Sequence, residues 1–335
     1  MRKYFSKKII ISILVAFLLI FYFTISYTKK VENPDYGISF NTVYAQELGL
    51  NWKEVYNALF TDLNIKNIRL AAHWNMVEPK KDTYDFEELD YQMRKATVEN
   101  AQIVLAIGKR LPRWPECHIP DWAVNLSKED QEKEILEYVE AVVNRYKNYN
   151  SIVMWQVENE PFLSVFARAH CFNFDEKFLE KEIELVKSLD SKKRPILITD
   201  SGELSTWRKA FRHGDVFGTT MYVYSWNELM GDFRNPFLPG FYSFRSNILN
   251  LFRKEHKQTI IAELSLEPWL DKPVIKEQTD IQVQRMSPEK FATVIEFAKK
   301  TGMKTQYLWG AEWWYYMKLQ GEDWYWDTAK ELFRL

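Results

Sequence analysis

Short apolar runs alternate with longer amphipathic stretches along most of the chain, and few folds can accommodate this alternation. Each run is rich in Ile, Val, Leu or aromatic residues and lacks a strict polar–apolar pattern, which is typical of parallel strands covered on both faces. The runs are Gly37–Asn41, Asn67–Ala71, Gln102–Ile107, Ile152–Val157, Pro195–Thr199, Val216–Met221, Thr259–Glu263 and Gln306–Trp309. Eight strands alternating with helices predict an α/β protein with a (β/α)8 TIM barrel.

Helix signals stand between the runs. Ser127 can cap the helix that follows it, with Asp130 three residues later, and Ser287-Pro288 opens another helix in the order cap, then proline. A doubly wound open sheet would show a similar alternation, but no glycine-rich phosphate loop follows the first run, and the chain has only 11 Gly. We therefore predict that residues 37–335 form a single barrel domain.

The N-terminus carries a different pattern. Four basic residues within positions 2–8 precede an uncharged apolar stretch from Ile9 to Thr28, and two lysines follow it. The stretch is long enough to cross a bilayer as a helix, and no small-residue cleavage site follows it. We therefore favour an uncleaved transmembrane signal-anchor over a cleaved signal peptide. The heavier basic flank comes first, which predicts a cytoplasmic N-terminus and an extracytoplasmic barrel.

These signals divide the chain into three parts. Residues 1–30 would be a cytoplasmic tip and a single membrane span, residues 31–36 a short linker, and residues 37–335 the catalytic barrel. The expected partner of the first part is the lipid bilayer.

Composition excludes some partners and suggests others. The net charge is -1, from 45 basic and 46 acidic residues, so we expect no nucleic-acid partner. The five His residues show no HxH or HExxH spacing, so we expect no metal and no cofactor. The 13 Trp residues are suited to stacking on the apolar faces of sugar rings, although they also fill aromatic-rich cores.

Two glutamates stand where strands of the predicted barrel end. Glu160 follows the fourth run, and Glu263 ends the seventh. Because functional groups of barrels collect at the C-terminal ends of the strands, these two carboxyls would face each other across the barrel mouth. Such a pair suffices for glycoside hydrolysis, since one carboxyl can protonate the leaving oxygen while the other attacks the anomeric carbon. A helix cap or an ion pair is the structural alternative for each.

The stretch Trp-Gln-Val-Glu-Asn-Glu-Pro, which contains Asn159-Glu160, resembles the retaining glycoside hydrolases of clan A. It is most similar to cellulase-like and β-galactosidase-like members, which have catalytic glutamates at the ends of strands four and seven. The resemblance implies that Glu160 is the acid/base, that Glu263 is the nucleophile and that Asn159 holds the sugar 2-hydroxyl. It covers residues 37–326.

Other positions agree with the clan. Arg69 matches its arginine on strand two and Tyr222 its tyrosine after strand six, and both would keep Glu263 ionised. Trp309 matches the tryptophan that ends strand eight as a sugar platform, and Trp74 lies in a stretch that resembles the one after strand two. We also expect Trp269, on a presumed loop, to contact substrate. Packing in the core is the alternative for each side chain.

Two further glutamates compete for the catalytic roles. Glu158 precedes Glu160 by two residues, but it does not directly follow the asparagine as the acid of the clan does. Glu267 lies four residues past Glu263, and we expect it to line the cleft or to support Trp269.

Cys117 and Cys171 follow the third and fourth runs, so they stand on neighbouring loops of one barrel face. A disulfide is the ordinary state of two such cysteines in an exported domain. Because each lies next to a histidine, His118 or His170, a zinc site is an alternative, and free thiols are a third.

The function that these residues indicate is retaining hydrolysis of O-glycosidic bonds in oligo- or polysaccharides, with β-linkages expected. A transglycosylase would use the same residues. A membrane-anchored glycan-binding barrel without activity is the alternative from another class. The clan includes cellulases, mannanases, xylanases and β-galactosidases, and no loop of this chain favours one of them.

Overall fold

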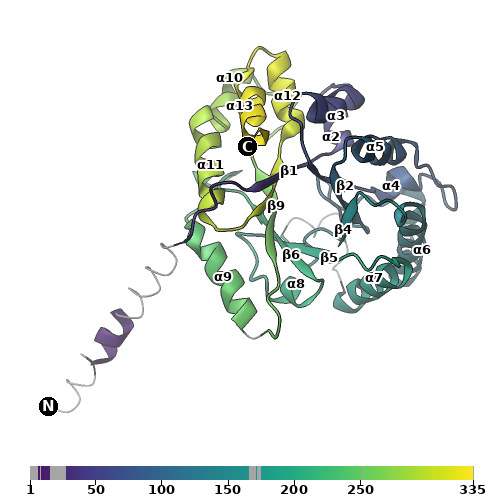
Figure 1. The fold of residues 1–335 in the computed structure, drawn as a ribbon, viewed down its shortest axis with the longest axis horizontal. Coiled ribbons are helices and arrows are strands. Elements are labelled where there is room, and N and C mark those ends of the chain that lie inside the picture. The colour runs from purple at the N-terminus through teal and green to yellow at the C-terminus, as the bar shows by residue number, and fades with distance from the viewer. Residues whose placement is uncertain are drawn as a thin grey trace.

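The fold is described from a computed structural model, which places residues 7, 9–15, 28–165, 171, 175–251 and 253–334. Eight parallel strands close into a barrel in the order β1-β10-β9-β6-β5-β4-β3-β2 (Figure 1). They are β1 (Asp35–Ser39), β2 (Asn67–Ala71), β3 (Gln102–Ile107), β4 (Ile152–Val157), β5 (Ile196–Asp200), β6 (Val216–Met221), β9 (Thr259–Ser265) and β10 (Thr305–Trp309). The predicted barrel is confirmed, and each boundary lies within two residues of its predicted position.

Helices surround the strands (Figure 1). They are α2 (Thr42–Glu47), α3 (Trp52–Thr61), α4 (Trp74–Val77), α5 (Glu87–Val98), α6 (Lys128–Tyr146), α7 (Glu176–Leu189), α8 (Arg208–Arg212), α9 (Pro239–Leu251), α10 (Thr279–Arg285), α11 (Pro288–Lys300), α12 (Ala311–Leu319) and α13 (Trp324–Phe333), with 3-10 turns at Asp121–Ala123 and Val274–Lys276. The two predicted caps are present. The Ser127 side chain accepts from the Asp130 N–H, and the Ser287 side chain accepts from the Lys290 N–H.

The strands are buried on both faces, which is why their sequences do not alternate. Inside the barrel, one apolar cluster is formed by Val104, Leu197, Val216, Ile260 and Tyr307. The larger core lies between the strands and the helices. Gly37 leaves room for the Tyr307 ring, because a Cβ at position 37 would lie 2.7 Å from it.

An antiparallel hairpin, which the sequence pattern did not predict, follows β6. It consists of β7 (Tyr224–Asn227) and β8 (Gly231–Arg234). Its strands are too short to give a periodic apolar signal. The turn between them uses Gly231 with φ of 66°, a left-handed conformation that glycine adopts easily.

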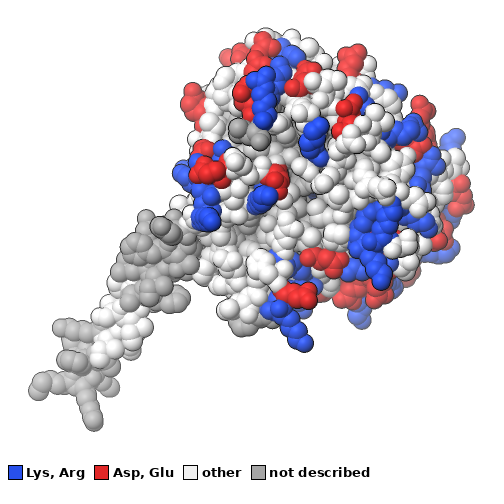
Figure 2. All heavy atoms as spheres, viewed as in Figure 1, with Lys and Arg blue, Asp and Glu red and all other residues white. Residues whose placement is uncertain are grey.

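Residues 30 and 31, just before the first strand, pack against α11. Lys30 pairs with Glu296 of α11 at 2.9 Å, and the Val31 N–H donates to the Lys299 carbonyl. Strand β1 already begins at Asp35, inside the predicted linker. Most of the predicted membrane span lies outside the described residues, and among those described no helix is long and apolar enough to cross a membrane. Acidic and basic side chains are interspersed over the barrel surface in Figure 2.

Candidate active site

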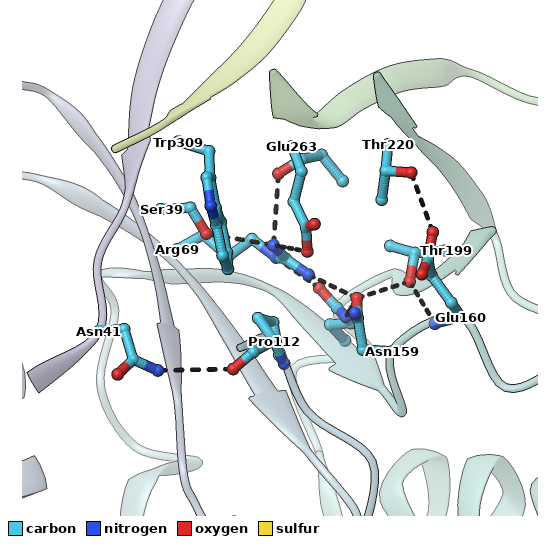
Figure 3. Close-up of polar contacts among 12 residues, drawn as sticks. Ser39, Asn41, Arg69, Pro112, Asn159, Glu160, Thr199, Thr220, Glu263 and Trp309 are labelled. Atoms are coloured by element: carbon cyan, nitrogen blue, oxygen red, sulfur yellow. Dashed lines mark hydrogen bonds and ion pairs between the residues drawn. The ribbon is translucent and has the colours of Figure 1, made fainter. Parts of the chain in front are cut away.

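Glu263 projects from β9 toward Arg69 of β2 in the barrel mouth (Figure 3). Arg69 and Tyr222 contact its two carboxylate oxygens. The Arg69 Nη1 donates to Glu263 Oε1 at 2.7 Å, and the Tyr222 hydroxyl donates to Oε2 at 3.2 Å. Both contacts are the ones expected from the sequence. Glu263 is thus paired with a cation and a phenol hydroxyl, an arrangement suited to a nucleophile.

The Arg69 guanidinium is fully engaged by residues at the ends of three other strands. Besides Glu263, its nitrogens donate to the Ser39 hydroxyl at 3.1 Å, to Gln156 Oε1 at 2.7 Å and to Asn159 Oδ1 at 2.8 Å. Such a set of acceptors compensates for taking the cation out of water. Arg69 therefore cross-links β1, β2, β4 and β9 directly beneath the mouth.

Asn159 has its amide orientation fixed. Its Oδ1 accepts from Arg69, from Gln156 Nε2 at 3.1 Å and from the Thr199 hydroxyl at 3.0 Å. With the oxygen saturated by three donors, the Nδ2 group is the part of the side chain available to a ligand. A sugar hydroxyl is a suitable acceptor for it.

Glu160 is held by its backbone and by one neutral donor. Its φ is 46°, its N–H donates to the Thr199 hydroxyl at 2.9 Å, and its carbonyl accepts from Arg110 at 2.8 Å. The Thr220 hydroxyl donates to its carboxyl at 2.9 Å. Burial and the nearby charge of Glu263 raise the pKa of Glu160 well above its usual value. This carboxyl can therefore carry a proton at neutral pH, as a general acid must.

Glu158, the first rival, turns away from the mouth. It is fully buried, and its two oxygens accept from the backbone N–H groups of Lys109 and Arg110 at 2.7 and 2.6 Å. Burial raises the pKa of Glu158 to about 7. Its carboxyl fixes the loop after β3, so it is not positioned as a second acid at the mouth.

Glu267, the second rival, supports Trp309, a partner that the sequence did not suggest. The Trp309 indole N–H donates to Glu267 Oε1 at 2.8 Å, and Arg113 pairs with both carboxylate oxygens. The Arg113 guanidinium lies between two rings, 4.2 Å from the centroid of Trp309 and 3.5 Å from that of Tyr44. These contacts close one side of the mouth.

The two remaining tryptophans differ in position. Trp74 is 0% exposed, donates to Glu78 at 2.8 Å and packs edge-on against Trp122. The prediction that Trp74 contacts substrate is therefore wrong, because its ring is part of the core. Trp269 is 37% exposed and lies edge-on to Tyr222, with ring centroids 5.4 Å apart. It remains a candidate for a sugar contact.

The loop from Arg110 to His118 carries charged residues that the sequence analysis missed. Arg110 is buried and donates to the Glu116 carboxylate as well as to the Glu160 carbonyl. Burial raises the pKa of Glu116, although Arg110 opposes this. The signal that could have found these residues is their place directly after the third strand, where barrel side chains reach the mouth.

A disulfide ties this loop to the segment after β4. Cys117 and Cys171 are bonded, with Cα atoms 5.7 Å apart, as predicted. Because the two sulfurs bond to each other, the zinc site and the free thiols are both excluded in this state. The bridge therefore joins the loop after β3, whose Arg110 contacts Glu160, to the segment that follows Glu160 in the sequence.

One group of carboxylates within the described part of the chain could hold a metal ion. Asp82, Glu134 and Glu137 have oxygens within 4.8 Å of one another. The Lys81 ammonium lies 2.7 Å from Glu134 and partly neutralises the group. Acidic groups at the surface are common without a metal, and nothing further indicates one here.

A closed (β/α)8 barrel with one glutamate after an asparagine at the fourth barrel strand and another on the seventh defines the class of clan A retaining glycoside hydrolases. Within this class, residues 50–247 match the model of glycoside hydrolase family 42, described as beta-galactosidase. The match spans more than half of the chain, and the chain belongs to this family. The matched range contains Arg69, Glu160 and Tyr222 and ends before Glu263.

Known relatives are distant and longer. The beta-galactosidase BgaA of Clostridium cellulovorans is 28% identical over 199 aligned positions. The alignment covers 52% of this chain and 29% of that protein. The beta-galactosidase LacZ of Lactobacillus acidophilus is 24% identical over 155 aligned positions, in an alignment that covers 41% of this chain and 23% of that protein. The chain thus matches less than a third of the length of these relatives.

The same fold occurs in solved structures. A glycoside hydrolase of family 5, subfamily 18, from Bifidobacterium longum, in complex with Manβ1-4GlcNAc, aligns with a TM-score of 0.59. The alignment covers 82% of this chain and 68% of that chain at 10% identity. At this identity the similarity concerns the fold alone.

Proposed function

We propose that the protein is a retaining glycosidase in which Glu160 is the acid/base and Glu263 the nucleophile. The observation that carries the proposal is the contrast between the two carboxyls. Glu263 faces the Arg69 cation and the Tyr222 hydroxyl, whereas within the described structure the Glu160 carboxyl accepts a hydrogen bond only from the neutral Thr220 hydroxyl. Pairs of carboxyls whose environments separate their pKa values divide the roles of acid and nucleophile.

The reaction would run in two displacements. In the first, Glu263 attacks the anomeric carbon while Glu160 gives its proton to the leaving oxygen, and a glycosyl-enzyme ester forms. In the second, Glu160, now a carboxylate, takes a proton from water, and this water displaces Glu263 with return of the original anomeric configuration. A retaining mechanism requires the two carboxyl groups to lie about 5–5.5 Å apart.

The substrate that the family supports best is a β-galactoside. The family model is described as beta-galactosidase, and both relatives carry that name. The closed side of the mouth, where Arg113 covers the Trp309 ring, suits the recognition of one terminal sugar. We therefore propose action on terminal β-linked galactose.

A panel of fluorogenic β-glycosides, assayed with the full chain, tests this function. The β-galactoside should be cleaved fastest, and proton NMR should detect the β-anomer as the first product. A first product of α-configuration would contradict retention. No cleavage of any glycoside, together with binding of glycans, would support the inactive glycan-binding alternative, and sugar-containing products would support the transglycosylase.

We also propose that the barrel works outside the cytoplasm. The Cys117–Cys171 disulfide supports an oxidising compartment. The apolar side chains of residues 9–15 are exposed to solvent, and this supports our proposal that a membrane anchor lies there. Fractionation of the producing cell, followed by protease treatment of intact cells, tests both points. A protease-resistant barrel in the cytoplasmic fraction would contradict them.

A further inference from the structure

A hollow of ≈ 260 Å³ lies between the segment that follows β4 and the segment that follows β5. Its floor contains the buried Asp200. Its walls combine apolar, hydroxyl and basic side chains, which are Phe162, Ser164, Val165, Leu204, Thr206 and Lys209. Strands β4 and β5 are neighbours in the barrel, so the hollow opens at the same end as Glu160.

The hollow is continuous with the Glu160 segment. The Leu163 N–H donates to the Glu160 carbonyl at 2.9 Å, and Arg110 donates to the carbonyls of both residues. One wall therefore begins at Phe162, two residues after the proposed acid Glu160, and is held in place next to it. Since the acid has to contact the leaving oxygen, the leaving group must extend on the side of Glu160. The opposite side of the mouth is closed by Arg113 and Trp309.

Building on the proposed function, we propose that this hollow receives the leaving-group sugar and that Lys209 selects a sugar with an anionic substituent, such as the carboxylate of a hexuronic acid. The half-buried Phe162 ring offers an apolar face to a pyranose. The hydroxyls of Ser164 and Thr206 can exchange hydrogen bonds with its hydroxyls. Lys209 Nζ lies over the Phe162 ring, 5.6 Å from its centroid, so a sugar that contacts this ring comes close to the ammonium group.

The charge of Lys209 is available for a ligand. No carboxylate within the described ranges lies within ion-pair distance of it. Glu176, whose pKa Lys209 helps to lower, is already paired with Arg212 and His213 at 2.7 and 2.9 Å. Lys209 is exposed at the rim, so an anion that binds it would not have to displace a carboxylate of the described residues.

The carboxyl of Asp200 is directed at its own neighbours. It accepts from the Ser201 N–H at 2.9 Å and from the Ser205 hydroxyl, so both oxygens are engaged inside the protein. Burial raises the pKa of Asp200, although these two donors oppose the rise. The hollow therefore combines an apolar ring, two hydroxyl groups and an engaged carboxyl with one exposed cation at its rim.

The test compares two disaccharides that share β-galactose and differ in the leaving sugar, which is glucose in one and glucuronic acid in the other. The ratio of their kcat/KM values should favour glucuronic acid by about tenfold in the wild-type protein, the usual size of one charge-assisted hydrogen bond. Lys209→Gln should bring the ratio close to one. Arg208→Gln removes a neighbouring charge of the same helix that does not line the hollow, and it should keep the wild-type ratio.

The outcomes separate the inference from the proposed function. Cleavage of aryl β-galactosides with a wild-type ratio near one, or an equal loss of the ratio in both variants, would overturn the role of Lys209 and leave the glycosidase intact. If no glycoside is cleaved, the proposed function fails. The inference is then decided by NMR titration of the full chain with methyl glucuronoside and with methyl glucoside. A preference for the glucuronoside that is lost in Lys209→Gln supports the inference, and equal binding of the two glycosides overturns it.

Discussion

The Arg69 guanidinium and the Glu263 carboxylate form an ion pair of 2.7 Å in which the side chains are 1% and 4% exposed. The same guanidinium also donates to Asn159, the residue before Glu160. One buried cation thus connects the strand of the proposed nucleophile to the segment of the proposed acid/base. A change in this cation should affect the charge of one glutamate and the position of the other.

Replacing Arg69 by Met should lower both activity and stability. Glu263 would lose its ion-pair partner in the barrel mouth, and we expect kcat/KM to fall about 10²–10³-fold. An unpaired buried carboxylate should also lower the free energy of unfolding by about 3–5 kcal/mol. Steady-state kinetics and urea unfolding measure the two effects.

The matched control is the double variant Arg69→Met with Glu263→Gln. It removes both charges, so it should recover part of the stability but none of the activity. If the double variant is as unstable as the single variant, the charge of Glu263 is not the cause of the lost stability.

The two proposed catalytic glutamates should respond differently to the leaving group. Glu263→Ala removes the attacking group, so turnover should fall for every substrate. Glu160→Ala should affect natural sugar leaving groups severely and activated phenols less, because a good leaving group needs little protonation. Comparison of aryl glycosides with a disaccharide measures this contrast.

Azide distinguishes the two variants further. In Glu160→Ala it should attack the accumulated glycosyl-enzyme and give a glycosyl azide of retained configuration, whereas in Glu263→Ala the product should be inverted. The reverse pattern would mean that the two roles are exchanged.

The Thr220 hydroxyl should set the alkaline limb of the pH profile. It donates to Glu160 and thereby favours the carboxylate, so it lowers the pKa of this group. In Thr220→Val the pKa of Glu160 should rise, and the alkaline limb of kcat/KM should move to higher pH because the acid keeps its proton longer. Thr220→Ser, which retains the hydroxyl, should keep the wild-type profile. A shift to lower pH in the valine variant would contradict this assignment.

Loss of the disulfide should destabilise the barrel. The bridge closes a loop of 54 residues, for which we expect a contribution of about 2–4 kcal/mol. The double variant Cys117→Ser, Cys171→Ser should therefore have a lower Tm than the wild-type protein, and reductant should lower the Tm of the wild type alone. An effect of reductant on the double variant would point to a cause other than the bridge.

The buried Glu158 and Glu182 pair should make stability fall between about pH 4.5 and pH 7. Burial raises the pKa of Glu158 to about 7, and burial with the charge of Glu158 raises that of Glu182. The native state then binds more protons than the unfolded state in this window, so the free energy of unfolding decreases with rising pH by about 1.4 kcal/mol per pH unit for each proton. Urea unfolding at several pH values measures the slope, and Glu182→Gln should reduce it. An unchanged slope in this variant would exclude the pair as its source.

The strands were predictable because each is a run of apolar residues buried on both faces, and this signal is local. The positions of Glu160 and Glu263 at the barrel mouth were predictable for a related reason, since each stands at the end of an apolar run. The contacts of Arg69 and Tyr222 with Glu263 were expected from the resemblance to clan A, not from the strand pattern.

The loop residues were not predictable, because their partners are distant in the sequence. Arg113 pairs with Glu267 and stacks on Trp309 only after the barrel has closed. Trp74 shows the same limit, since a tryptophan after a strand can face a ligand or the core, and its neighbours Glu78 and Trp122 decide for the core.

The packing of Lys30 and Val31 against α11 determines how the barrel would be oriented on any support that holds its N-terminus. The chain enters the barrel at the start of β1 (Figure 1). Glu160 follows the C-terminal end of β4, and Glu263 lies near the C-terminal end of β9. A tether at the N-terminus would leave the cleft facing outward, toward arriving substrate. Long glycans could then reach the two carboxyls without passing between the protein and the surface that carries it.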